Sequence, residues 1–244
     1  MGATGPGLVS APMGARRATG SLALVGGGEW GPGARGFDAE LLARSGTDEV
    51  VVLPTAAAYE HPERVGERAE AYFGELGAKV RTLPVLHRSE AEDVAMAKVV
   101  RAAKFVYLAD GSPLHLRSVL KESALFEALL AAYQGGAVVA ASGAGATLLC
   151  DPMVDPRGGA YTVGLGVVKN LAVFPYHGTA ADHMRERSID LLPAQAKLVG
   201  IDEETALVKD PEGGWRVAGA GVVTLYEGRT TREYPSGSVV DALS

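Results

Sequence analysis

The stretch AVVAASGAGATLLCDPM, residues 137–153, says more about the fold of this chain than any other. Five Ala and Val residues lead into Ser142-Gly143-Ala144-Gly145 and then into a second apolar segment. An apolar run that ends at a glycine-rich turn and then continues is typical of a buried strand turning sharply into a helix. In many hydrolases this turn reads G-x-S-x-G and holds a nucleophilic serine at its centre. Here the serine lies one position early, and glycine occupies the apex.

On either side of this stretch, short apolar runs bounded by glycine or proline alternate with longer amphipathic segments. The predicted strands are residues 21–28, 48–56, 78–85, 104–111 and 137–142. The predicted helices lie near residues 36–45, 61–76, 89–103 and 113–134. Strands that alternate with helices and are apolar throughout indicate a parallel sheet with helices on both faces. The fold class is therefore three-layer α/β with a mostly parallel sheet.

The C-terminal part has a different pattern, because from about residue 160 most segments are strand-like. One polar helix is predicted near residues 179–192, and DPEGGW, residues 210–215, is predicted to be a hairpin turn. Earlier in the chain, Ser89 with Glu92 predicts a capping-box start for a helix. We expect one α/β domain over residues 21–244, with a strand-rich C-terminal part.

The composition restricts the class of protein. The chain has 244 residues, of which 47% are hydrophobic and 21% are charged. A chain of this length can bury a hydrophobic core that needs no disulfide or metal ion to stabilise it. Its formal charge is −6 and no run of Lys or Arg occurs, so neither nucleic acid nor a membrane surface is an expected partner. No segment reaches the ~20 uncharged apolar residues of a membrane span.

The N-terminal segment and the cysteine content predict the cellular compartment of the protein. Residues 1–20 are rich in Gly, Ala and Pro and lack the apolar core of a signal peptide, so we expect a disordered tail or a cloning remnant. Cys150 is the only cysteine, which excludes an intrachain disulfide and a paired-cysteine metal site. A reducing cytoplasm is the predicted compartment.

Three glycine-containing turns follow predicted strands, at residues 26–28, 110–112 and 142–145. In open α/β sheets, ligands bind outside the carboxyl ends of the strands. The first turn either lets backbone approach a ligand or makes a tight exit from its strand. It lacks the G-x-G-x-x-G spacing of a dinucleotide site, and no cofactor is predicted.

The second turn predicts both a helix start and a pair of donors. Ser112 and Pro113 fit an N-cap and the first helical residue. The N–H groups of Gly111 and Ser112 would then lie at a helix N-terminus, where they suit an oxyanion or a carboxylate. His115, inside that helix, is expected to be structural.

The other histidines predict one candidate base and no metal site. His61 and His87 have no carboxylate or thiol at ligand spacing, and His183 belongs to a polar helix face. His177 follows a strand-like segment, where a general base beside a nucleophile is expected. His177 and His183 without a third ligand make a poor metal site.

Taken together, these turns resemble peptidase family S51, the aspartyl dipeptidases and cyanophycinases, whose fold is similar to that of class I glutamine amidotransferases. The matching segments are LVGGG (24–28), VYLADGSPLHLRSVL (106–120), AASGAGATLLCDPM (140–153), GLGVVKNLAVFPYH (164–177) and GIDEETALV (200–208). They cover roughly residues 21–226 in the family's order. The resemblance implies a serine nucleophile, a histidine base and an oxyanion hole that together cleave peptides with an acidic residue.

Carried over residue by residue, the resemblance fails at both reacting groups. The nucleophile's position falls on Gly143, and the histidine's position falls on Tyr176, with His177 one step beyond. Asp110 stands where the family has the first glycine of a Gly-Gly turn. The backbone donors of Gly111 and Ala144 match the family pattern.

Glycine adopts the strained conformation of an elbow apex at little cost, so Gly143 keeps the turn and removes the hydroxyl. Ser142 is expected to face away from the pocket, because successive side chains of a strand point to opposite faces. A relocated pair of Ser142 and His177 would need a bulge in each strand. Independently of such a pair, Tyr176 is expected to form a polar wall of the pocket, and Cys150 is expected to pack in the core.

Two hypotheses follow. In the first, the chain is an S51-like serine hydrolase whose catalytic residues are Ser142 and His177; the candidate acid partners are Glu203, Asp155 and Asp151. In the second, it is a non-catalytic protein that binds a small peptide or carboxylate in a pocket made by Gly111, Ser112, Gly143, Ala144 and Tyr176. The residues favour impaired or absent peptidase activity. Arg117 and Arg185 are the candidate pocket cations, and the oligomeric state stays open, a homodimer included.

Overall fold

The computed structural model describes residues 19–228 and 230–243. Apart from Thr19 and Gly20, the tail predicted for residues 1–20 lies outside the described residues. The α-helices are α1 (Arg35–Ser45), α2 (Pro62–Glu75), α3 (Arg88–Ala91), α4 (Val94–Ala102), α5 (Pro113–Leu120), α6 (Ala124–Gln134), α7 (Ala144–Leu149) and α8 (Asp182–Asp190). Short 3-10 helices span Thr55–Ala57 and Asp241–Leu243.

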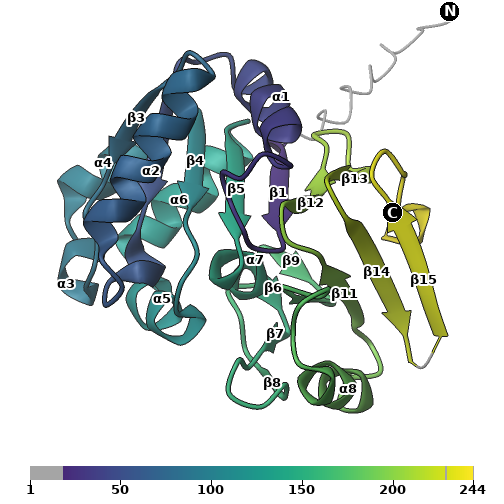
Figure 1. Ribbon diagram of the computed structural model, residues 1–244. Coiled ribbons are helices and arrows are strands. Elements are labelled where there is room, and N and C mark those ends of the chain that lie inside the picture. The colour runs from purple at the N-terminus through teal and green to yellow at the C-terminus, as the bar shows by residue number, and fades with distance from the viewer. Residues whose placement is uncertain (1–18, 229, 244) are drawn as a thin grey trace, which may run out of the picture.

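The main sheet has the strand order β13-β12-β1-β5-β4-β2-β3 (Figure 1). Its strands are β1 (Leu22–Val25), β2 (Glu49–Leu53), β3 (Lys79–Thr82), β4 (Phe105–Leu108), β5 (Val138–Ser142), β12 (Thr205–Lys209) and β13 (Trp215–Gly219). The pairs β1–β5, β5–β4, β4–β2 and β2–β3 are parallel, whereas β12 and β13 add an antiparallel edge. The predicted mostly parallel sheet is confirmed.

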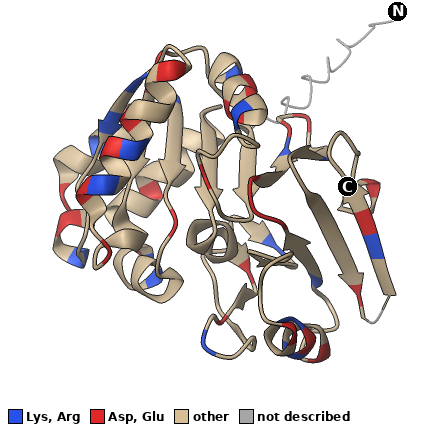
Figure 2. Ribbon diagram, in the orientation of Figure 1, with Lys and Arg blue, Asp and Glu red and all other residues tan. Residues whose placement is uncertain are grey.

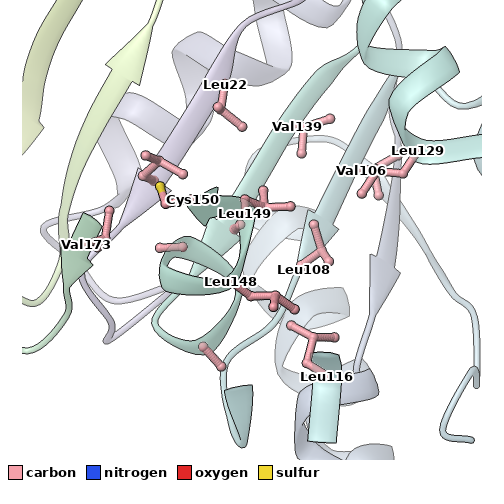
Figure 3. Close-up of a cluster of buried hydrophobic side chains, with 14 of the residues drawn as sticks. Leu22, Val106, Leu108, Leu116, Leu129, Val139, Leu148, Leu149, Cys150 and Val173 are labelled. Atoms are coloured by element: carbon pink, nitrogen blue, oxygen red, sulfur yellow. The ribbon is translucent and has the colours of Figure 1, made fainter. Parts of the chain in front are cut away.

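Successive residues of the central strands pack into two different cores, which makes the molecule three-layered. On β1, Ala23 and Val25 face α1 and α2, which lie in front of the sheet in Figure 1. Leu22 and Leu24 pack into the opposite core with α4, α5, α6 and α7, part of which Figure 3 shows around Cys150. Because both faces are covered, these strands are apolar throughout rather than alternating.

The strand-rich C-terminal part forms a second sheet of order β10-β11-β14-β15, beside the main one (Figure 1). Its strands are β10 (Leu171–Phe174), β11 (Lys197–Ile201), β14 (Val222–Glu227) and β15 (Thr230–Pro235). Short pairs are made by β6 (Cys150–Asp151) with β9 (Val168–Lys169) and by β7 (Met153–Val154) with β8 (Tyr161–Thr162). The predicted hairpin at DPEGGW joins β12 to β13, where the Asp210 N–H donates to the Gly214 carbonyl at 2.9 Å.

Charged residues of both signs are interspersed along the helices, as Figure 2 shows for α1 and α2. In the described part of the chain, no helix combines the length and the apolarity that crossing a membrane requires.

Two helices predicted as continuous are broken by side chains that cap a new start. The segment 89–103 forms α3 and α4, because the Asp93 carboxylate accepts from the N–H groups of Ala95 and Met96. The capping box predicted at Ser89 was wrong: α3 has His87 as its N-cap, and the Glu90 carboxylate accepts from the His87 N–H at 2.9 Å. Local capping thus competes with the apolar periodicity that predicted one long helix.

The second break lies at Ser123, and it carries a stability prediction. The Ser123 side chain is fully buried; its hydroxyl donates to the Leu120 carbonyl at 2.8 Å and accepts from the Phe126 N–H at 3.1 Å. Replacing Ser123 by alanine leaves that buried N–H unpaired, so we expect Ser123→Ala to lower the free energy of unfolding by about 1–2 kcal/mol in urea titrations. The control is Ser118→Ala, whose exposed hydroxyl donates to the His115 carbonyl. Equal losses in the two variants would contradict the capping role.

Candidate functional site

A sharp turn joins β5 to α7 at the carboxyl edge of the main sheet (Figure 1). Its apex, Gly143, has φ 43° and ψ −97°, a conformation that favours glycine. The Gly143 N–H donates to the Val25 carbonyl of the neighbouring strand at 2.9 Å. The predicted succession of strand, glycine turn and helix is therefore present.

The carboxylate of Asp110, from the loop between β4 and α5, fills the space in front of this apex. A Cβ added at Gly143 would come closer than 3.0 Å to both carboxylate oxygens of Asp110, a separation that real Cβ atoms do not show. Asp110 Oδ1 accepts from the N–H groups of Gly111 and Ala144, both at 2.7 Å. The two backbone donors predicted for an oxyanion thus bind a carboxylate of the protein itself.

Tyr176, at the position where the resemblance implies a histidine, completes this arrangement. Its hydroxyl donates to Asp110 Oδ2. Burial, reinforced by the charge of Asp110, raises the pKa of Tyr176, which keeps the phenol protonated as a donor.

The glycine turn after β1 holds Tyr176 in place. The Tyr176 N–H donates to the Gly26 carbonyl at 2.6 Å, and its ring lies where a Cβ on Gly27 would be. Tyr176 itself has φ 54°, which is unusual for a bulky residue. The glycines at residues 26–28 therefore allow close approach of a side chain from the same chain.

Ser142, the residue before the apex, makes no hydrogen bond to Asp110 or Tyr176 within the described residues. Its side chain is fully buried, and its hydroxyl donates to Glu29 Oε2 at 2.9 Å. Burial, with a smaller contribution from Asp110, raises the pKa of the Glu29 carboxyl. The Arg68 guanidinium lies 3.8 Å from Glu29 Oε1 and donates to the Glu29 carbonyl.

His177 contacts neither Ser142 nor Glu203 through a hydrogen bond recorded for the described residues. Its Nε2 lies 2.7 Å from the Tyr226 hydroxyl, and its Nδ1 lies 3.4 Å from Asp202 Oδ1. Burial lowers the pKa of His177. The catalytic roles of Ser142 and His177 therefore stay predictions, and the carboxylate beside His177 is one that the sequence analysis did not select.

The candidate acid partners make contacts of their own. Glu203 accepts from the Thr179 hydroxyl at 2.9 Å, and Asp155 pairs with Arg157. Asp151 accepts from the Gly164 N–H at 3.1 Å.

Ser112 caps α5 as predicted, because its hydroxyl accepts from the His115 N–H at 3.3 Å. Its own N–H, predicted to point into the pocket, donates to the Ala56 carbonyl at 2.8 Å. The candidate pocket cations are engaged elsewhere: Arg117 donates to the Val163 carbonyl at 2.7 Å, and Arg185 pairs with Asp182.

Two cavities meet at Asp110, Gly111 and Tyr176. One, of about 230 Å³, has mostly apolar walls that include Phe174 and Met184. The other, of about 400 Å³, is lined by polar side chains: Glu29, Glu60, Arg68 and Glu203. Neither Arg117 nor Arg185 lines them. Within the described residues, no group of three His, Cys, Asp or Glu side chains is placed to hold a metal ion.

The arrangement of Asp110 and Tyr176 was missed by the sequence analysis, although it contains a signal. By the resemblance, Asp110 stands where a glycine is expected and Tyr176 where a histidine is expected, while Gly143 stands at the position expected for the serine. Three departures that affect one point of the fold indicate that the groups contact one another, and only the structure shows how.

Comparison with known proteins gives one consistent result. Residues 22–213 match the profile of peptidase family S51. The chain is 28% identical over 223 residues to a cyanophycinase from Trichormus variabilis, covering 85% of this chain and 73% of that protein. It is 27% identical over 212 residues to a cyanophycinase from Geminocystis herdmanii, covering 80% and 75%.

Solved structures agree with this match. A peptidase from an acI-B1 actinobacterium superposes with a TM-score of 0.83 at 28% identity, over 92% of this chain and 98% of that one. A putative peptidase E protein from Listeria monocytogenes superposes with a TM-score of 0.60, over 89% and 99%; at 15% identity it supports the fold alone.

Proposed function

The chain belongs to peptidase family S51, and we propose that it is a member without serine-peptidase activity that binds a small peptide ligand in the retained cleft. The single observation that carries this proposal is the Asp110 carboxylate. It accepts from the Gly111 and Ala144 N–H groups and fills the space in front of Gly143.

The magnitudes support loss of hydrolysis rather than a modest reduction. Removing a catalytic serine costs on the order of a millionfold in rate. Removing one oxyanion-hole donor from an otherwise intact enzyme lowers the rate by roughly 10²–10³-fold. Here the apex has no hydroxyl, and both backbone donors are engaged by a negatively charged group, which an oxyanion would have to displace.

The alternative, hydrolysis by a relocated Ser142 and His177, has one supporting contact: the Ser142 hydroxyl donates to a carboxyl group, that of Glu29. However, the Ser142 side chain is fully buried, and His177 is held by Asp202 and Tyr226. A substrate carbonyl would have to reach a hydroxyl inside the core.

A fluorophosphonate probe and a panel of Asp-X dipeptides with beta-aspartyl-arginine test the proposal. We expect neither labelling nor hydrolysis above the level of the Ser142→Ala variant, because the serine nearest the apex is inaccessible. Ser118→Ala serves as the control for labelling of an exposed serine. Labelling or turnover that disappears in Ser142→Ala would show a working relocated nucleophile and overturn the proposal.

A reducing cytoplasm is the proposed location. Its support is the thiol of Cys150, which is fully buried and whose pKa is raised by that burial, as expected of an inert core cysteine.

A further inference from the structure

We infer that the cleft binds a ligand that carries a protonated amine next to an apolar side chain, with the amine at Asp110 and the side chain in the apolar cavity. This inference rests on the proposed binding function and specifies its ligand. It differs from the acidic peptide that the resemblance to the family implied and from the carboxylate ligand predicted for the Gly111 and Ser112 N–H groups.

The first step is the hydrogen-bonding capacity of Asp110. A carboxylate offers about four lone-pair sites. Oδ1 takes the N–H groups of Gly111 and Ala144, and Oδ2 takes the Tyr176 hydroxyl. One acceptor site on Oδ2 is left by these three bonds, and Asp110 lines both cavities, so that site suits a further donor from a ligand.

The second step is the sign of the charge. A ligand carboxylate at this point would find both backbone donors engaged and would lie beside a like charge, which is unfavourable. The polar cavity adds the carboxyl groups of Glu29, Glu60 and Glu203. Its arginine, Arg68, already lies beside Glu29 and over the Trp30 ring, 5.4 Å from the ring centroid. The field at the junction therefore favours a cation.

The third step is the shape and chemistry of the other cavity. Its walls include Pro113, Val154, Phe174 and Met184, with Asp110 as its charged group. Apolar walls favour an apolar side chain, because its transfer from water is favourable. A cation and an apolar group on the same carbon, as on the Cα of an amino-acid amide or of a peptide N-terminus, fit this pairing.

The test uses four probes in calorimetric titrations of the whole chain. Leucinamide carries the amine and the side chain, glycinamide only the amine, N-acetyl-leucinamide only the side chain, and N-acetyl-leucine the side chain with a negative charge. We expect leucinamide to bind at least tenfold more tightly than each of the other three. Its affinity should fall as salt is added, because the attraction is electrostatic.

A matched pair of variants locates the charge. We expect Asp110→Asn to weaken leucinamide binding at least tenfold, whereas Asp48→Asn, an exposed carboxylate elsewhere, should leave it unchanged. The salt dependence of the parent protein tests the same point if Asp110→Asn does not fold.

The outcomes separate the two proposals. Tighter binding of N-acetyl-leucine than of leucinamide overturns the inferred ligand class and leaves the binding function standing. Absence of binding by all four probes overturns the inferred ligand. Conversion of leucinamide to leucine and ammonia, detected as continuing heat and as product, would instead contradict the proposed loss of hydrolysis.

Discussion

The triple variant Asp110→Gly/Gly143→Ser/Tyr176→His is expected to gain peptidase activity, whereas Gly143→Ser alone is expected to remain inactive. The reason is steric and electrostatic. A serine Cβ at position 143 would overlap the Asp110 carboxylate, and the backbone donors of Gly111 and Ala144 would still be occupied. The new hydroxyl would therefore have neither room nor an oxyanion hole.

Each of the other two changes supplies one missing group. Asp110→Gly removes the carboxylate and frees both N–H groups. Tyr176→His places an imidazole where the phenol now points to the apex, and histidine tolerates the positive φ of this position better than bulkier residues. Glu203, one of the predicted acid partners, lines the same polar cavity as Tyr176 and is the candidate to orient that imidazole.

The measurement is hydrolysis of the dipeptide panel, together with fluorophosphonate labelling at position 143. Since nucleophile, base and oxyanion donors act as a unit, we expect the triple variant to exceed the parent by at least ~10³-fold. The control is Asp110→Gly/Tyr176→His, which has the donors and the base but no hydroxyl. Activity in Gly143→Ser alone would show that Asp110 moves aside, and the blocked-site interpretation would be wrong.

Asp38→Asn is expected to stabilise the protein at pH 8 and to remove most of one pH-dependent contribution to its stability. Asp38, on α1, is fully buried; the Tyr72 hydroxyl of α2 donates to its Oδ2 at 3.0 Å, and its Oδ1 has no hydrogen-bond partner among the described residues. Burial raises the pKa of Asp38 from 3.8 to about 8, and the hydrogen bond from Tyr72 offsets this only in part.

The sign follows from which state holds the proton. Between about pH 4 and pH 8 the folded protein keeps the Asp38 proton, whereas the unfolded chain has released it. Stability therefore falls as pH rises through this window, by about 1.4 kcal/mol per pH unit and on the order of 5 kcal/mol in total. An amide of the same shape does not ionise, so the variant lacks this loss.

Urea titrations of parent and variant between pH 4 and pH 8 measure the difference. We expect the two free energies of unfolding to be similar near pH 4 and to diverge as pH rises, with the Asp38→Asn variant the more stable. The exposed Asp48→Asn provides the control for removing one carboxylate. Parallel curves for parent and Asp38→Asn would mean that Asp38 ionises in the folded state at its ordinary pKa.

The layers and the position of the cleft could be predicted from the amino-acid sequence alone. Strands that are apolar throughout, such as residues 137–142, require cover on both faces, and the glycine at position 143 requires a sharp turn after one of them. Both features are local, so composition and spacing reveal them. The helix breaks at Asp93 and Ser123 were missed because a capping side chain competes with a periodicity that continues across it.

The chemistry of the site depends instead on contacts between distant parts of the chain. Asp110 reaches the Ala144 N–H 34 residues away, and Tyr176 reaches Asp110 across 66 residues. Such contacts depend on the register of β4, β5 and β1 and on the path of the loops that leave them, which no local pattern encodes. The sequence showed a glycine where a nucleophile was expected. That a carboxylate occupies the vacated space follows from how three distant loops meet at one edge of the sheet.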